Sequence, residues 1–400
     1  MIDSVQTVAL PDGRQVHARL DGGFEPMLAT FVENFTDRHD LGAGCSVLID
    51  GAPVFEAWGG IADRRTGRPQ SHDTAAVIFS CSKGILAACA YRLLDQGRLD
   101  LDLPVAHYWP EFARNGKEHL TVRQVLSHRA GLAALDRDLT RSEVLAWQPV
   151  IAAIENQAPL HTPEEGFVYH ALTYGWLVGE IIRRVTGELP GAYLRRELTG
   201  PLGLRMWIGL PPGAEDLAWM EAPLPDEDSP EARLAAELYS REPVVGRSLS
   251  MGGAFDFPAD DAGHVTFNDD DIQRAEVPGA NGISSAAALA RFYAACLGDD
   301  ATPGLLSREA IEGALVPRSW GTQLTGSPDD GARWGTGFQL ASPPSQPMLG
   351  PTSFGHAGAG GQLGFADIKS GAAFAYLSNQ MGGYGDARAK SLTESLAMCL

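Results

Sequence analysis

Strand-like segments occupy both ends of the chain, and helix-like segments fill its middle. Residues 44–61 have the pattern of a β-hairpin: AGCSVLID alternates apolar and polar side chains, Gly51 marks a turn, and APVFEAWGG returns. Residues 354–380 have the pattern of successive antiparallel strands joined by glycine-containing turns. Segments of this kind bury their apolar faces most simply in one sheet. The sequence therefore predicts a mainly antiparallel sheet built from both termini, with a helical insertion between them.

This arrangement divides the chain into two parts. We expect an α/β (α+β) fold in which residues 1–84 and 279–400 form a sheet domain flanked by helices. Residues 85–278 form a mainly helical domain, and the active site lies between the two. The segments with helical patterns are 121–127, 142–156, 172–186, 191–198, the stretch AAALARFYAACLG capped by Ser284 or Ser285, and a last helix near 387–398.

Charge and composition exclude several partners. The chain has 31 Lys and Arg against 50 Asp and Glu, a formal net charge of −19. Such a balance disfavours both nucleic-acid binding and a polybasic membrane anchor.

There is no apolar run of about 18 residues, and the N-terminal segment lacks the basic and apolar regions of a signal peptide. The five cysteines are scattered without a CxxC pair, which suits a reducing compartment. We expect a cytoplasmic protein that acts on a small molecule, with no nucleic-acid or membrane partner.

Ser80 and Lys83 have the spacing of a nucleophile and its base. The apolar run Ala75–Phe79 leads into a helical pattern that starts near Ser80, so the two side chains lie one turn apart on one face. Apolar neighbours disfavour the charged form of the lysine and lower its pKa, and a neutral lysine activates a serine hydroxyl. The helix N-terminus also favours an oxyanion. The structural alternative is a capping serine and a lysine that extends to solvent.

Two other segments carry groups that suit the same chemistry. Tyr169 lies between a loop and an apolar helix, where its hydroxyl can face a cleft and relay a proton. Its structural alternative is to anchor the helix start. His356, Gly358 and Ala359 lie on a predicted strand: the glycine permits close approach of a substrate, and the N–H of Ala359 is a candidate oxyanion donor. A single histidine is also common as a purely structural residue.

Together, the SxxK, Y-x-x and H-x-G elements resemble the class C β-lactamase superfamily, which includes β-lactamases, DD-peptidases and the family VIII carboxylesterases. The resemblance covers nearly the whole chain, including GRLDLDLPVAHYWPEF, LSHRAGL, FVYHALTYGWLVGEIIRRVTG and NGISSAAALARFYA. It implies a β-lactamase/DD-peptidase-like fold. By the same resemblance Ser80 is the acylated nucleophile, Lys83 is its base partner, and Tyr169 shuttles the proton to the leaving group and helps to activate water.

The resemblance also assigns the third element and exposes two departures. His356 and Gly358 occupy the K-T-G element, and the N–H groups of Ser80 and Ala359 form the oxyanion hole. The family's Y-x-N asparagine, which helps to hold the lysine and contacts amide substrates, is Ala171 here. The K-T-G lysine, which helps to hold a substrate carboxylate, is His356, although some DD-peptidases and D-aminopeptidases also carry H-x-G.

These departures favour an ester over an anionic amide as the substrate. We expect a serine carboxylesterase that hydrolyses small or short-chain esters through an acyl-enzyme on Ser80, with β-lactam hydrolysis as a weak side activity. The alternatives are a β-lactamase, a DD-peptidase or a transacylase with the same machinery, and a non-catalytic binding protein of the same fold. The oligomeric state does not follow from the sequence.

The remaining patterns add pocket candidates and no cofactor. The ten histidines show no HExxH or other metal-ligand spacing, and no Walker A or GxGxxG motif is present, so we expect neither a metal nor a cofactor. Trp320, Trp334 and Phe338 are candidates for lining an acyl pocket. The Pro- and acid-rich segment 211–245 is a candidate cover for the cleft. His128 in LSHRAGL is expected to be structural.

Overall fold

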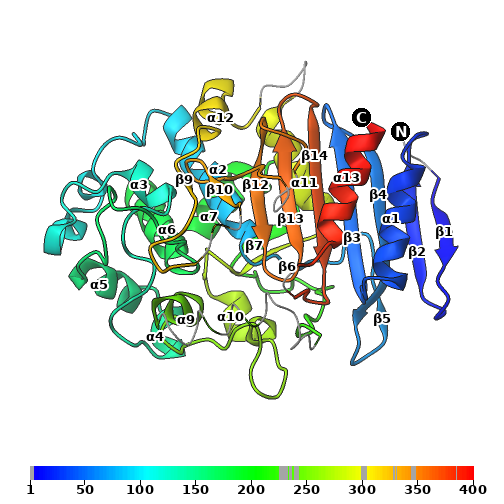
Figure 1. The fold of residues 1–400 in the computed structure, drawn as a ribbon, viewed down its shortest axis with the longest axis horizontal. Coiled ribbons are helices and arrows are strands. Elements are labelled where there is room, and N and C mark those ends of the chain that lie inside the picture. Colours follow the sequence, from blue (N-terminus) through cyan, green and yellow to red (C-terminus); the bar gives the residue numbers. More distant parts are fainter. Residues whose placement is uncertain are drawn as a thin grey trace.

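A large antiparallel sheet brings the two ends of the chain together (Figure 1). The computed structural model describes residues 4–224, 233, 237, 243–298, 304–327, 329, 331–343, 348–383 and 385–400. In spatial order the strands are β1 (Gln6–Ala9), β2 (Gln15–Leu20), β4 (Ala52–Asp63), β3 (Gly42–Ile49), β14 (Ala372–Ser378), β13 (Gln362–Asp367), β12 (Ser353–Gly358), β11 (Gln339–Leu340), β10 (Arg333–Trp334) and β9 (Ser319–Trp320); β5 (Arg68–Pro69) pairs with β4.

The predicted hairpin and the predicted union of the termini are both confirmed. Strands β3 and β4 pair antiparallel on either side of Gly51, whose φ of 77° lies in the left-handed region that favours glycine. Strand β3 pairs on its other edge with β14, with Val47 opposite Phe374. An N-terminal strand and a C-terminal strand therefore lie side by side at the centre of the sheet.

Helices cover both faces of this sheet, because neighbouring residues of a strand point to opposite faces. A Cβ on Gly364 of β13 would lie 2.7 Å from Leu289 of α11 (Ala286–Leu297), so α11 packs closely on that face. The next residue, Phe365, points the other way, into a cluster with Leu392 and Leu396 of α13 (Arg388–Cys399). Helix α1 (Glu25–Thr36) packs beside α13 on this second face (Figure 1). The expectation of a sheet flanked by helices is confirmed.

The middle of the chain is mostly helical, as its patterns predict. Its helices are α3 (Val122–Leu126), α4 (Arg141–Leu145), α5 (Gln148–Asn156), α6 (Thr173–Thr186), α7 (Pro190–Leu194), α9 (Pro243–Ser250) and α10 (Asp270–Arg274), with the short η1 (Val105–His107), η2 (Pro110–Gly116), η3 (Arg195–Thr199) and η4 (Thr266–Asn268). Helix α12 (Arg308–Ala314) follows α11. Within the described ranges, every helix is too short or too polar to cross a lipid bilayer.

Two details differ from the expected helical pattern. The single helix expected over 142–156 is wrong: Trp147 has a φ of 66°, and a proline in the first turn of α5 then starts a new helix. The middle of the chain also contributes β7 (Met206–Ile208) to a small sheet with β6 (Ala76–Val77) and β8 (Gly282–Ser284).

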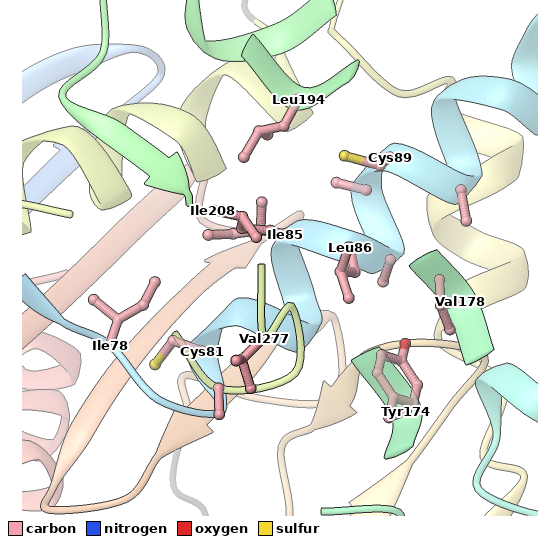
Figure 2. Close-up of a cluster of buried hydrophobic side chains, with 14 of the residues drawn as sticks. Ile78, Cys81, Ile85, Leu86, Cys89, Tyr174, Val178, Leu194, Ile208 and Val277 are labelled. Carbon is pink, nitrogen blue, oxygen red and sulfur yellow. The ribbon is translucent and has the colours of Figure 1, made fainter. Parts of the chain in front are cut away.

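Helix α2 (Cys81–Asp95) runs through the centre of the molecule. Almost all of its side chains up to Leu93 are buried, which is the expected state of a helix that is apolar all round. Figure 2 shows Ile85 and Leu86 between side chains of α6 and residues near α7 and β7, with Tyr174 and Ile208 among them. Because α2 is enclosed on all sides, the residues at its N-terminus are held rigidly.

Candidate active site

The predicted site residues surround one pocket of about 440 Å³ at the N-terminus of α2. Its lining residues are Phe79, Ser80, Tyr169, Ala171, Leu172, Leu249, Phe257, Phe267, Ala280, Gln323, Ala332, Trp334, Gln339, His356, Ala357, Gly358 and Ala359. Lys83 is fully buried and bonded to Ser80. The structure thus brings together all six residues that the sequence analysis singled out.

A strained turn presents Ser80 at this place. Phe79 has a φ of 43°, which is unfavourable for a bulky side chain. Its ring lies 5.4 Å from that of Phe267 and 6.4 Å from that of Phe257, and this packing holds the turn. Ser80 follows at the N-cap of α2 but makes no side-chain capping bond. The capping alternative for Ser80 is therefore wrong, and its hydroxyl is left for another partner.

That partner is Lys83, whose side chain is held entirely by oxygen acceptors. Its Nζ lies 2.9 Å from Ser80 Oγ, 2.7 Å from the carbonyl oxygen of Ala171 and 2.8 Å from that of Gly279. Burial lowers the pKa of Lys83 to about 7. A neutral amine has two N–H donors and one lone pair. The two carbonyl groups accept the two N–H bonds, so the lone pair of the neutral amine faces the Ser80 hydroxyl.

The main-chain carbonyl groups of Ala171 and Gly279 therefore orient Lys83, a role that the resemblance assigns to the asparagine of the Y-x-N element. The carbonyl of Gly279 reaches Lys83 because the segment around it packs tightly against the first turn of α6. A Cβ on Gly175 would lie 2.2 Å from the Gly279 nitrogen, a distance at which the backbone must move. No sequence pattern pointed to Gly279, although it lies in PGANGISS, directly before the helix predicted from AAALARFYAACLG.

Tyr169 lies beside this pair, and neighbours on several sides fix it. Its main-chain N–H donates to Gln323 Oε1 at 2.8 Å, and its ring centre is 4.7 Å from that of His128 and 5.5 Å from that of Trp334. Lys83 Nζ is 5.0 Å from the Tyr169 ring centre. Burial raises the pKa of the Tyr169 hydroxyl above its usual range, and its contact with Ser80 opposes this only in part. Tyr169 is thus protonated at neutral pH and suits proton relay.

His356 is neutral and enclosed. Its Nδ1 lies 2.6 Å from the carbonyl oxygen of Ala357, so Nδ1 carries the proton and donates. Burial, with the nearby Lys83, lowers the pKa of His356 to about 3. Two residues on, a Cβ at Gly358 would lie 2.4 Å from the carbonyl oxygen of Ile78, so only glycine lets β12 approach the turn before Ser80.

Ala359 begins the turn that follows β12, directly after Gly358. Gln339 Oε1 accepts the N–H of Ala357 at 2.8 Å, which holds the end of this strand beside the pocket. Ala359 and Ser80 both line the pocket, as a pair of oxyanion donors requires.

Of the three aromatic residues predicted to line the acyl pocket, only one lies in the pocket. Trp334 lines the pocket, but Trp320 is 58% exposed, and Phe338 is buried in the core with its ring stacked on Tyr91, so both of these assignments are wrong. His128 is buried, and its Nδ1 accepts the main-chain N–H of His170, which fits its expected structural role.

The apolar wall of the pocket was not foreseen. It comes from Phe79 and from Leu249, Phe257 and Phe267, which follow the segment expected to cover the cleft. Of that segment, 225–232, 234–236 and 238–242 lie outside the described residues. Gln323 and Gln339 were also missed, because their roles depend on contacts between loops and strands that no local pattern encodes.

Comparisons with known proteins identify a family and similar folds. A protein-family model described as Beta-lactamase matches residues 28–397. The chain is 35% identical over 381 residues to the esterase/beta-lactamase LipL of Mycobacterium tuberculosis, covering 93% of this chain and 85% of that protein. A crystal structure of a penicillin-binding protein homologue from Caulobacter crescentus is similar, with a TM-score of 0.83, 33% identity, and coverage of 95% of this chain and 98% of that one. A family VIII carboxylesterase structure gives a TM-score of 0.81 at 30% identity, covering 99% of this chain and 100% of that one.

Proposed function

The chain belongs to the beta-lactamase family of serine hydrolases, and we propose that within this family it is a carboxylesterase for uncharged esters. The observation that carries the proposal is the 2.9 Å contact between Ser80 Oγ and the buried amine of Lys83, in a pocket whose described lining residues include no Lys or Arg. The names of similar proteins, an esterase/beta-lactamase and a family VIII carboxylesterase, support it.

Acylation begins with neutral Lys83. Its lone pair takes the proton of Ser80, and Oγ attacks the carbonyl carbon of the ester. The N–H groups of Ser80 and Ala359 stabilise the oxyanion. When the carbon–oxygen bond to the alcohol breaks, the Lys83 ammonium returns the proton through the Tyr169 hydroxyl to the leaving oxygen. The products of this half are a free alcohol and an acyl-enzyme on Ser80.

Deacylation uses the same groups in the opposite direction. A water molecule takes the place of the alcohol and gives its proton to Lys83 through Tyr169 while its oxygen attacks the acyl carbon. The bond to Ser80 Oγ breaks, Lys83 returns the proton to Oγ, and the carboxylic acid leaves. Because Tyr169 stays protonated in the resting enzyme, it acts as a relay and not as the initial base.

The electrostatics of the pocket favour a neutral substrate. None of the described residues that line it is Lys or Arg, and His356 is neutral at physiological pH. The carboxylate of a β-lactam or a peptide would lose its hydration there without gaining an ionic partner among these lining residues. The net charge of −19 further disfavours the approach of anions.

The test is hydrolysis of p-nitrophenyl butyrate and a chromogenic cephalosporin, measured in parallel. We expect ester turnover that falls by roughly 10⁴-fold in Ser80→Ala, and little cephalosporin turnover. Ser142→Ala, on the exposed side of α4, is the matched control and keeps wild-type activity. Full esterase activity in Ser80→Ala would refute the nucleophile, and rapid cephalosporin turnover would make the protein a β-lactamase instead.

A further inference from the structure

Two glutamine side chains present unused donors to the pocket. Gln339 Oε1 accepts the N–H of Ala357, and Gln323 Oε1 accepts the N–H of Tyr169, both at 2.8 Å. The main chain therefore fixes which end of each amide is oxygen, and the NH₂ group of each points away from that bond. Within the described part of the chain neither NH₂ group makes a hydrogen bond, and both glutamines line the pocket. Gln339 is only 5% exposed.

His356 lines the same pocket and has an unused acceptor. Its Nδ1–H donates to the carbonyl of Ala357, so Nε2 of the neutral ring carries a lone pair. This Nε2 is buried and has no hydrogen-bond partner among the described residues. A buried polar atom without a partner carries a free-energy cost that a bound group removes.

These groups select the kind of ligand that satisfies them. Two NH₂ donors and one lone-pair acceptor, all uncharged, match a neutral group that both accepts and donates a hydrogen bond. A hydroxyl does so, and so does a carboxamide. A carboxylate offers no proton to His356 Nε2, and an ammonium offers no lone pair to the glutamine donors.

The position of these groups assigns them to the alcohol half of the ester. Tyr169 returns the proton to the leaving alcohol, so that half lies beside it. The His356 ring centre is 6.2 Å from that of Tyr169, and Gln323 is bonded to the Tyr169 main chain. The apolar side chains of Leu249, Phe257 and Phe267 also line the pocket, and they suit the acyl chain.

Resting on the proposed esterase function, we propose that the site recognises esters whose alcohol part carries a second, free neutral hydrogen-bonding group. The simplest such substrates are monoesters of a diol or polyol. Gln339, Gln323 and His356 hold the free hydroxyl, and Ser80 takes the acyl group from the neighbouring oxygen. Hydrolysis then releases the polyol and a carboxylic acid.

The test compares 2-hydroxyethyl butyrate with propyl butyrate, in which a methyl group replaces the hydroxyl, by titrating the butyric acid released. We expect kcat/KM to be roughly tenfold higher for the hydroxyl ester, the effect of two neutral hydrogen bonds. The methyl ether, 2-methoxyethyl butyrate, keeps an acceptor but loses the donor, and we expect an intermediate value. 2-Amino-2-oxoethyl butyrate tests the carboxamide; faster turnover of this ester than of the hydroxyl ester would still support the donor–acceptor site and identify an amide as its ligand.

A pair of variants locates the effect. Gln339→Glu keeps the oxygen that accepts the Ala357 N–H and loses the NH₂ donor, so the preference for the hydroxyl ester should fall to about twofold or less. Gln124→Glu is the matched control, because Gln124 Oε1 also accepts a main-chain N–H, from Thr121 at 2.9 Å, outside the pocket. The preference should persist in Gln124→Glu.

The inference is overturned if the wild type turns over the hydroxyl and propyl esters equally and the amide ester no faster. It is also overturned if the preference for the hydroxyl ester survives in Gln339→Glu. Neither result affects the proposed function, which is tested separately by the loss of propyl butyrate hydrolysis in Ser80→Ala. The wild-type comparison stands even if a variant does not fold.

Discussion

At the scale of single residues, the site depends on keeping one amine neutral. Lys83 is surrounded by apolar side chains and has no carboxylate among its hydrogen-bond partners, so burial dominates and its pKa falls to about 7. The carbonyl groups of Ala171 and Gly279 orient the amine without restoring its ordinary basicity. This combination yields a base that is half deprotonated near neutral pH and already in contact with its nucleophile.

The rate should therefore depend on pH through Lys83. The reactive form is the deprotonated amine, so kcat/KM for p-nitrophenyl butyrate should be constant well above pH 7 and fall about tenfold per pH unit below it. Rates measured between about pH 5 and pH 9 check this. A rate that still rises about tenfold per pH unit up to pH 9, as for a lysine with the ordinary pKa of about 10.4, would mean that the amine is not desolvated.

The glycine contact behind Lys83 gives a second prediction. In Gly175→Ala the added Cβ meets the Gly279 nitrogen at 2.2 Å, so the carbonyl that holds Lys83 must move. We expect kcat to fall roughly 100-fold, since displacements of this size misalign a catalytic group. Gly313→Ala is the control, because a Cβ there meets nothing within 4 Å. Wild-type kcat in Gly175→Ala would show that the Gly279 carbonyl is dispensable.

At the scale of elements, α2 joins the core to the chemistry. The helix is buried along most of its length, and Ile85 lies two residues beyond Lys83 among side chains from several other elements (Figure 2). Close packing of this kind lets a helix hold two side chains in a fixed relation. The stability of α2 and the precision of the site are therefore linked.

Truncation of Ile85 should show how much this packing contributes. Ile85→Ala removes a fully buried side chain and should lower the free energy of unfolding by about 2–5 kcal/mol, whereas Ile85→Val should lower it by about 0.5–1.5 kcal/mol. Urea unfolding followed by fluorescence measures both. Similar losses for the two variants would indicate that the core collapses around the missing atoms.

The elements also show where sequence patterns suffice. The hairpin at 44–61 and the helix after Ser285 could be predicted, because alternation, turn glycine and N-cap are local signals. The break at Trp147 could not, because tertiary packing and not the local pattern decides that a tryptophan takes a left-handed conformation. In the site, the SxxK element could be predicted because Ser80 and Lys83 share one helical turn. Gln323 and Gln339 could not, because they reach the site through contacts with residues distant in the sequence.

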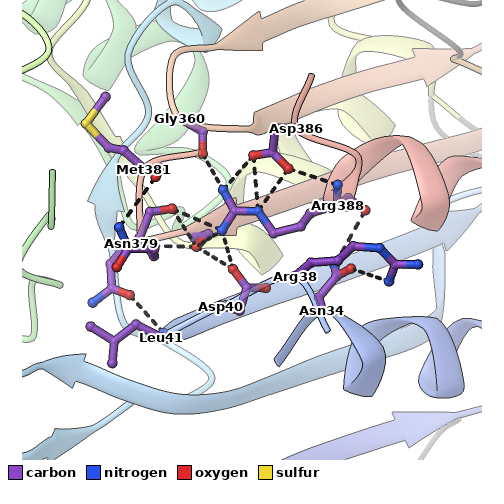
Figure 3. Close-up of polar contacts among 12 residues, drawn as sticks. Asn34, Arg38, Asp40, Leu41, Gly360, Asn379, Met381, Asp386 and Arg388 are labelled. Atoms are coloured by element: carbon purple, nitrogen blue, oxygen red, sulfur yellow. Dashed lines mark hydrogen bonds and ion pairs between the residues drawn. The ribbon is translucent and has the colours of Figure 1, made fainter. Parts of the chain in front are cut away.

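At the scale of the whole molecule, a buried polar network links the N-terminal and C-terminal parts of the chain (Figure 3). Arg388 at the start of α13 donates to Asp40 Oδ1 at 2.5 Å and also contacts Asp386. Asp40, which precedes β3, further accepts hydrogen bonds from Tyr376 and Ser378 of β14. The network lies where the N-terminal and C-terminal strands meet, so it supports the sheet that carries His356 and Ala359.

Removing the charge of Asp40 should destabilise the protein strongly. In Asp40→Asn the buried Arg388 loses one of its two carboxylate partners, and we expect the free energy of unfolding to fall by about 3–5 kcal/mol. Asp12→Asn breaks an ion pair with Arg14 at a half-exposed carboxylate and should change it by less than about 1 kcal/mol. Chemical denaturation of both variants measures the difference; equal losses would contradict a role for burial.

The central claim, that this fold positions Ser80 as an acylated nucleophile, is tested most directly by covalent labelling. An uncharged p-nitrophenyl phosphonate diester should transfer its phosphonyl group to Ser80 Oγ and release p-nitrophenol. Mass spectrometry of the digested protein should place the added mass on the peptide that contains Ser80, with no labelling of this peptide in Ser80→Ala. Labelling at another residue, or none in the wild type, would contradict the claim.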